Sequence, residues 1–136
     1  MKRFQLIEHT ADIGLKAKGN SLNEAFANAA YGLFSIITDL RRVRTKESEV
    51  VTVRAEDYES LLFSWLNQLI YIFDVKHVLF KEFEINRFAE RSLKATCRGE
   101  KYDPSRHQIK IGVKSATYHM LKVDRGNNKV QVIFDV

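Results

Sequence analysis

Residues 13–26, with the sequence IGLKAKGNSLNEAF, pass from a strand pattern into a helix pattern across one short turn. Apolar and polar side chains alternate from Ile13 to Lys18, which predicts a half-buried β-strand. Gly19-Asn20 favours a turn, because both residues tolerate turn conformations. Ser21-Leu22-Asn23-Glu24 then has the spacing of a capping box, in which a serine hydroxyl and a glutamate carboxylate satisfy free amides at a helix start. The stretch therefore predicts a strand followed directly by a helix.

Two helices are predicted from periodicity. In the first, apolar side chains recur at i, i+3, i+4 and i+7, and the helix is expected to end near residue 37 or 38. Its apolar positions are Leu22, Ala25, Phe26, Ala29, Leu33, Phe34 and Ile37. The second is expected to begin after Asp57, which suits an N-cap. Its apolar positions are Leu61, Leu62, Trp65, Leu66, Leu69, Ile70 and Phe73. Further apolar residues widen that surface, so this helix is expected to lie deep, between a sheet and the first helix.

The remaining segments favour strands, at residues 4–8, 49–54, 78–88, 93–101, 109–113, 119–124 and 129–134. A chain of 136 residues is long enough to bury a core without disulfides. The predicted fold class is α+β, a single domain over residues 1–136 with two helices packed on a mixed or largely antiparallel β-sheet.

The composition of the chain favours some classes of function and excludes others. The net charge is +5, and residues 91–136 carry ten Lys and Arg against four Asp and Glu. Such a surface favours phosphate-bearing partners, although a solubilising surface explains it equally well. Cys97 is the single cysteine, which excludes an internal disulfide and a zinc site made of cysteines. Since no apolar run reaches the roughly 20 residues of a membrane span, we expect a cytoplasmic protein with no membrane partner.

The segment Glu8-His9-Thr10-Ala11-Asp12-Ile13-Gly14 places an imidazole, a hydroxyl and two carboxylates between two predicted strands. Asp12 could cap the turn, bind a hard cation or act in acid–base chemistry. If it lies near the final strand, its carboxylate meets those of Asp135 and the terminal residue Val136. Oxygen donors of this kind favour Ca²⁺ or Mg²⁺. On spacing alone, the turn cap explains Asp12 better than the cation site does.

Four further residues are candidates for chemistry. His9 could ligate a metal, act as a base or make only structural hydrogen bonds. Thr117 and His119 would share one face of a regular strand, but no Gly-x-Ser-x-Gly segment accompanies them. Lys114 could reach a phosphate, pair with the carboxylates or be solvated. The residues by themselves leave these alternatives open.

Five segments together resemble the archease family, in order and position, over essentially the whole chain. They are residues 8–14 (EHTADIG), 21–26 (SLNEAF), 61–69 (LLFSWLNQL), 113–119 (VKSATYH) and 135–136 (DV). The resemblance implies an accessory protein without catalytic residues of its own. It would activate an RtcB-type RNA ligase, promoting guanylylation of the ligase and its multiple turnover in tRNA splicing and RNA repair. Contact with tRNA would be indirect, through the ligase, and a chaperone role toward a tRNA methyltransferase is also implied.

For the site, the resemblance implies a divalent metal held by Asp12, Asp135 and Val136, with Ca²⁺ expected and Mg²⁺ or Mn²⁺ as alternatives. Lys114, Asp12 and Asp135 would serve ligase activation, and His9, Thr117 and His119 could support them. Two other functions stay open. A stand-alone metal-dependent phosphoester hydrolase would use the same carboxylates with a histidine base. A basic RNA-binding or chaperone module for tRNA-modifying enzymes would use the face formed by residues 91–136.

Overall fold

The computed structural model describes residues 3–8 and 12–136. In that part of the chain the elements are, in order, β1 (Phe4–Glu8), β2 (Asp12–Lys18), α1 (Leu22–Ile37), the 3₁₀ turn η1 (Leu40–Arg42), β3 (Glu47–Arg54), α2 (Tyr58–Lys76), β4 (Val78–Ala89), β5 (Ser92–Lys101), β6 (Ser115–Asp124) and β7 (Lys129–Asp135). No helix among them combines the length and the apolar character that crossing a membrane requires.

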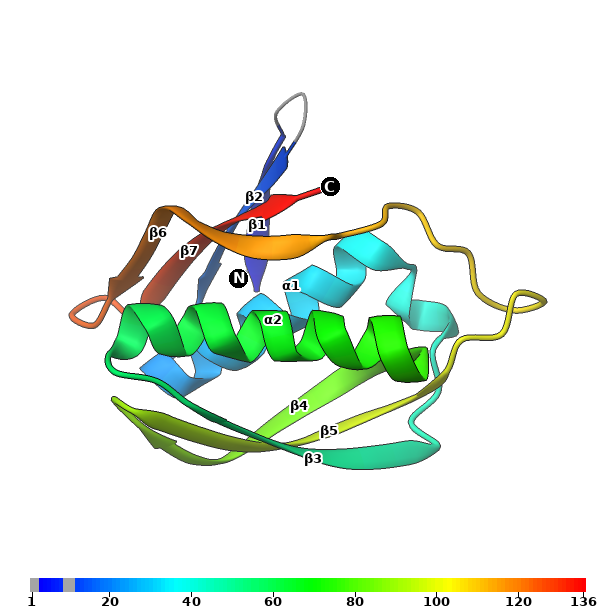
Figure 1. The fold of residues 1–136 in the computed structure, drawn as a ribbon, viewed down its shortest axis with the longest axis horizontal. Helices are drawn as coiled ribbons and strands as arrows, with labels where there is room; N and C mark the ends of the chain where they lie inside the picture. The colour runs from blue at the N-terminus through cyan, green and yellow to red at the C-terminus, as the bar shows by residue number, and fades with distance from the viewer. Residues whose placement is uncertain (1–2, 9–11) are drawn as a thin grey trace.

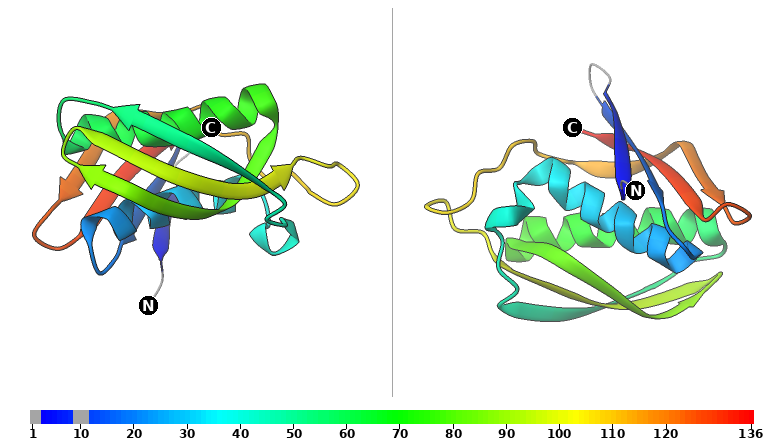
Figure 2. Two further views of the ribbon diagram at one scale, coloured as in Figure 1. Left: turned by 90° about the horizontal axis from the view of Figure 1, so that it is seen from below. Right: turned by 180° about the vertical axis from the view of Figure 1, so that it is seen from behind.

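The described strands form two sheets, and the helices fill the layer between them (Figure 1). One sheet has the order β1-β2-β7-β6 and the other the order β3-β5-β4. Every pairing between these strands is antiparallel. The views from below and behind in Figure 2 show the same layering. The predicted α+β class, with two helices packed on antiparallel strands, is confirmed, although the strands divide into two sheets where one was expected.

The middle layer explains why α1 is buried on more than one side. It packs against β2 of one sheet and β4 of the other, and a helix covered on both sides needs apolar residues beyond a single stripe. Gly32 allows the closest approach, because a Cβ at this position would lie 2.4 Å from Cδ1 of Leu15 on β2. Trp65 of α2 donates its indole N–H to the carbonyl of Phe26 at 3.1 Å, which joins the two helices inside the core.

Both predicted helix starts are confirmed. Ser21 Oγ accepts a hydrogen bond from Glu24 N at 3.3 Å, and Glu24 Oε1 accepts one from Asn20 N at 3.1 Å. The glutamate thus reaches one residue further back than a regular capping box requires. At α2, Asp57 accepts a hydrogen bond from Ser60 N at 2.8 Å. These caps fix where the chain turns away from each preceding strand.

The segment 109–113 is not a strand, so that prediction is wrong. It makes one isolated bridge, between Ile109 and Thr38. The Thr38 hydroxyl also donates to the Gln108 carbonyl at 2.7 Å, and Lys110 N donates to the Ile37 carbonyl at 2.7 Å. The end of α1 therefore holds this segment by hydrogen bonds, where pairing with a neighbouring strand was expected. Its apolar side chains pack from a loop. The strand after it begins at residue 115, four residues earlier than expected.

Candidate functional site

One end of the four-stranded sheet brings together residues from the two ends of the chain. Asp12, the first residue of β2, lies directly opposite Asp135, the last residue of β7. Asp135 in turn lies opposite Ser115, the first residue of β6. Side chains directly opposite each other in an antiparallel pair stand on the same face of the sheet, with Cβ atoms about 5 Å apart. Figure 1 shows the end of β7 beside β2. Two of the three groups predicted to converge, Asp12 and Asp135, are therefore neighbours across β2 and β7.

Asp12 is partly buried, and one of its carboxylate oxygens is unusual. Its Oδ1 atom is inaccessible to solvent and has no hydrogen-bond partner among the described residues. A buried carboxylate oxygen without a partner is costly, because it has lost water and gained nothing in exchange. A second carboxylate, that of Asp135, lies opposite on the same face and adds like-charge repulsion. A cation between the two would remove both costs.

Lys114 is tied to this end of the sheet through its backbone. Its N–H donates to the carbonyl of Asp135 at 2.8 Å. Its side chain is exposed, as is that of Asp135. Val136 packs against the edge of the core, which fixes the direction in which the chain leaves β7. Asp12, Asp135, Val136 and Lys114 therefore share one end of one sheet.

The supporting candidates behave differently. The Thr117 hydroxyl donates to the Ile133 carbonyl at 2.9 Å, a structural bond to the neighbouring strand. The register of β6 breaks between Thr117 and Lys122, so the regular alternation that was expected to put Thr117 and His119 on one face does not continue past Thr117. His119 is exposed. His9 lies outside the described residues.

The donor set fits a hard cation. No group of three His, Cys, Asp or Glu side chains within residues 3–8 and 12–136 is arranged to hold a metal ion. Two of the expected carboxylates, however, are side by side, and one has an orphaned oxygen. Carboxylate and carbonyl oxygens suit Ca²⁺, Mg²⁺ or Mn²⁺ better than zinc or copper. What the side chains supply is thus two neighbouring carboxylates, and further oxygen donors would have to complete the site.

A buried ion cluster, which the sequence patterns did not indicate, anchors the loop that leads to Lys114. Glu100 is 4% exposed and accepts hydrogen bonds from the Arg106 guanidinium at 2.9 and 2.7 Å. The N–H of Arg44 donates to the same carboxylate at 2.8 Å. His107 Nε2 lies 2.9 Å from it, and His107 Nδ1 accepts a hydrogen bond from Asp103 N at 2.9 Å. Since Nδ1 is an acceptor, Nε2 carries the ring proton and donates it.

This cluster perturbs the carboxyl group strongly. The Arg106 hydrogen bonds, helped by those from Arg44 and His107, lower the pKa of Glu100 to about 2 against the opposing effect of burial. A perturbed buried group can mark an active site, but here both carboxylate oxygens are hydrogen-bonded by the fold itself. The cluster is structural: it fixes the path of residues 102–114. Only the contacts formed across the loop could have revealed it, since Glu100, Arg106 and His107 match no motif.

The observed fold defines a class of small α+β proteins with two helices between antiparallel sheets and an acidic pair at the end of one sheet. The model of the Archease protein family (MTH1598/TM1083) matches residues 4–136. A protein archease of Sulfurisphaera tokodaii is 39% identical over 137 residues, covering 100% of this chain and 99% of the relative. A protein archease of Pyrococcus abyssi is 41% identical over 142 residues and covers 100% of both chains.

Two solved structures are similar. The solution structure of Methanobacterium thermoautotrophicum protein 1598 has a TM-score of 0.82 and 34% identity, covering 100% of both chains. The crystal structure of a Thermotoga maritima protein, described as an archease and possible chaperone, has a TM-score of 0.68 and 27% identity, covering 97% of this chain and 96% of that one. The chain belongs to the archease family.

Proposed function

We propose that this protein is an accessory protein of an RtcB-type RNA ligase. It promotes guanylylation of the ligase and its repeated turnover in tRNA splicing and RNA repair, acting from the sheet end that carries Asp12, Asp135 and Lys114. Membership of the archease family supports this role. The observation that carries it is the direct pairing of Asp12 with Asp135, with an orphaned carboxylate oxygen and a lysine beside it.

In this proposal, Asp12, Asp135 and the carboxylate of Val136 hold a divalent cation, with Ca²⁺ first and Mg²⁺ or Mn²⁺ as alternatives. When bound, the cation would offset two of the three carboxylate charges at this end of the sheet, which we call the tip (Asp12, Asp135, Val136 and Lys114). Lys114 adds a flexible ammonium group that suits a nucleotide phosphate. Because the tip lies at the end of a rigid sheet, it can dock at the nucleotide pocket of the ligase and orient its groups for attack on the phosphate. The bond-making chemistry stays with the ligase.

The test is GTP-dependent guanylylation of the ligase, with and without this protein. Asp12→Asn and Lys114→Ala should each lower the stimulated rate at least about tenfold, the effect of losing roughly 1.4 kcal/mol of interaction. Asp74→Asn and Lys94→Ala are the controls, because both side chains are exposed, Asp74 lies on α2 and Lys94 lies on β5 of the other sheet. The proposal fails if the tip variants stimulate guanylylation as well as the controls do.

Cation binding has a separate readout that needs no ligase. Addition of CaCl₂ should raise the melting temperature of the isolated wild-type protein, because a ligand that binds only the folded state stabilises it. Asp12→Asn should abolish that rise, whereas Asp74→Asn should retain it. An equal rise in both variants would contradict the site. Turnover of a phosphoester by the isolated protein would instead favour the stand-alone hydrolase.

A further inference from the structure

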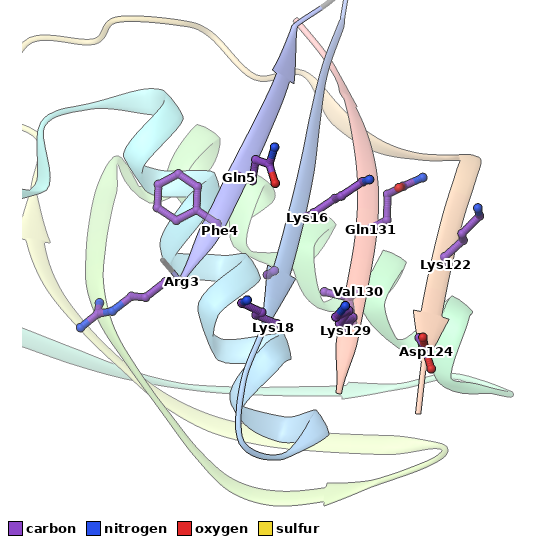
Figure 3. A pocket seen from close by; sticks show the side chains of 11 residues that line it. Arg3, Phe4, Gln5, Lys16, Lys18, Lys122, Asp124, Lys129, Val130 and Gln131 are labelled. Atoms are coloured by element: carbon purple, nitrogen blue, oxygen red, sulfur yellow. The ribbon is translucent and has the colours of Figure 1, made fainter. Parts of the chain in front are cut away.

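A face of lysine side chains covers the other end of the four-stranded sheet, away from Asp12. The register places Lys18 directly opposite Lys129, and places Lys16 and Lys122 on either side of Gln131. Lys16 and Lys18 are two residues apart on one strand and therefore point to the same face. Figure 3 shows these four lysines from three different strands around a single hollow. Lys16 and Lys18 lie near the start of the chain and Lys122 and Lys129 near its end, and the fold brings them together. We call these four side chains the lysine face.

The lysine face is at most partly neutralised within the described structure, because Asp124 is the only acidic residue that lines its hollow there. None of the four lysines takes part in a salt bridge to another described residue. Asp124, at the rim, already accepts hydrogen bonds from Asn127 N at 3.2 Å and Asn127 Nδ2 at 2.9 Å. Like charges directly opposite each other, as Lys18 and Lys129 are, destabilise a sheet. Asp124 lies opposite Lys129 on its other side and offsets part of this repulsion. The excess of positive charge that remains is what an external polyanion would relieve.

A distortion of β6 contributes one of these lysines. Six residues of β6, from Thr117 to Lys122, span the same length as three residues of β7, from Gln131 to Ile133, so β6 carries three extra residues here as a bulge. Within the bulge Met120 adopts a left-handed φ of 55°, which a non-glycine residue adopts at an energetic cost. The Gln131 side chain donates to the Met120 carbonyl at 2.8 Å and holds the bulge. An odd number of extra residues reverses the alternation, so that Lys122, and not Leu121, faces outward.

The hollow over the lysine face has a volume of about 630 Å³. It adjoins a second hollow of about 570 Å³ around the edge strand β1, and the two share Arg3, Phe4 and Gln5. In the second hollow the Arg3 guanidinium lies 4.2 Å from the centre of the Tyr31 ring, and the Phe4 and Tyr31 rings are 6.2 Å apart. Cationic side chains leading to aromatic rings are the combination by which proteins hold single-stranded nucleic acid.

We propose that the lysine face binds the phosphate backbone of single-stranded RNA, with Phe4 and Tyr31 at the end of its path. A membrane surface is the weaker candidate, because no exposed large apolar side chain lines the lysine hollow, and in the second hollow Leu6 is the single described one, 39% exposed. The choice of RNA over DNA rests on the proposed function. The surface is separate from the Asp12 tip, so one protein could contact a ligase and an RNA strand at the same time.

Fluorescence anisotropy of a labelled 12-nucleotide oligouridine, titrated with the isolated protein, tests this inference. If the four lysines and Arg3 each meet one phosphate, log K should fall with log salt at a slope of about −3.5, or about a hundredfold between 50 and 200 mM KCl. The double variant Lys18→Gln/Lys129→Gln should reduce the slope to about −2. Lys94→Gln/Lys101→Gln removes the same charge from exposed sites on the other sheet and should keep the wild-type slope.

The effect of these substitutions on stability can be separated from their effect on RNA binding. Removing the Lys18–Lys129 repulsion should leave the melting temperature at or above that of the wild type. Phe4→Leu should weaken RNA binding about fivefold or more without changing the salt slope, because a lost stack carries no charge. Equal slopes for the two double variants would overturn the inference. So would binding to phosphatidylserine vesicles in the absence of RNA binding.

Different measurements test the lysine face and the proposed ligase activation, so either proposal can be contradicted without the other. Guanylylation of the ligase is measured without RNA, so Lys18→Gln/Lys129→Gln should still stimulate it fully. Asp12→Asn should still bind oligouridine with the wild-type slope. Loss of both activities in the lysine variant would contradict the separation of the two surfaces, and full RNA binding by that variant would contradict the lysine face itself.

Discussion

Replacing Glu100 by Gln tests the buried ion cluster that fixes the loop before Lys114. The substitution keeps the shape of the side chain but removes its charge, which leaves the Arg106 guanidinium without its partner. Removing one partner of a buried pair costs roughly 3–5 kcal/mol. The pKa of Glu100, about 2 against an ordinary 4.5, corresponds to about 3 kcal/mol for the same set of contacts. Because the Arg106 side chain is 28% exposed, we expect the lower figure, about 3 kcal/mol at pH 7.

The loss should depend on pH in a defined direction. The folded state lowers the pKa of Glu100, so its stabilisation is fully present above the unfolded pKa of 4.5 and disappears as the pH falls toward 2. The difference in the free energy of unfolding between wild type and Glu100→Gln should therefore be constant near pH 6–7. This difference should shrink below pH 4.5, because the Glu100 carboxyl of the unfolded wild type then binds a proton and the stabilisation by the ionised group decreases.

Urea unfolding followed by tryptophan fluorescence is the assay, because the single tryptophan, Trp65, is fully buried and reports on the core. Measurements at pH 7, 5, 4 and 3 define the curve. Glu84→Gln is the matched control: that side chain is 57% exposed and pairs with Arg98 at 2.9 Å, so its loss should cost below about 1 kcal/mol. Equal losses in the two variants, or a Glu100→Gln loss that is the same at pH 7 and pH 3, would refute the reasoning.

Three further outcomes are expected from the core. Burial raises the pKa of the Cys97 thiol to about 12, so Ellman's reagent should react with it only after unfolding in urea, and rapid labelling of the native protein would contradict that burial. Gly99→Ala should lose about 3 kcal/mol in urea unfolding, because its Cβ would lie 1.8 Å from a β4 carbonyl oxygen. Gly112→Ala, with nothing within 4 Å, is its control, and similar losses would argue against the close approach. Asn67→Ala should cost about 2 kcal/mol in the same assay, since Asn67 bonds both the N–H and the carbonyl of Ala116. An unchanged urea-unfolding curve would show that this link between α2 and β6 is dispensable.

Local features of the fold could be predicted because their causes lie within a few residues. The caps at Ser21 and Asp57 depend on side chains that reach an amide three residues away, and both form. The two helices follow from apolar periodicity, and most strands from alternation and turn residues. The segment 109–113 was mistaken for a strand because its apolar residues are equally suited to packing as a loop beneath the end of α1.

Non-local features could not be predicted in this way. The division into two sheets depends on which strands pair, and that depends on how the helices fill the layer between them. The bulge in β6 and the outward direction of Lys122 depend on the Gln131 side chain of a different strand. The Glu100 cluster depends on a loop folding back on itself, so nothing in the local pattern indicated it.

The sequence by itself determined both helices, most of the strands, the α+β class and the residue types available for chemistry, including Asp12, Asp135 and Lys114. Only the tertiary structure decided that Asp12 and Asp135 stand face to face, that one oxygen of Asp12 is buried without a partner, and that lysines from both halves of the chain form one surface. The physical reason is that strand register is set by core packing across the whole sheet. A shift of one residue between β2 and β7 would separate the carboxylates and the lysines alike.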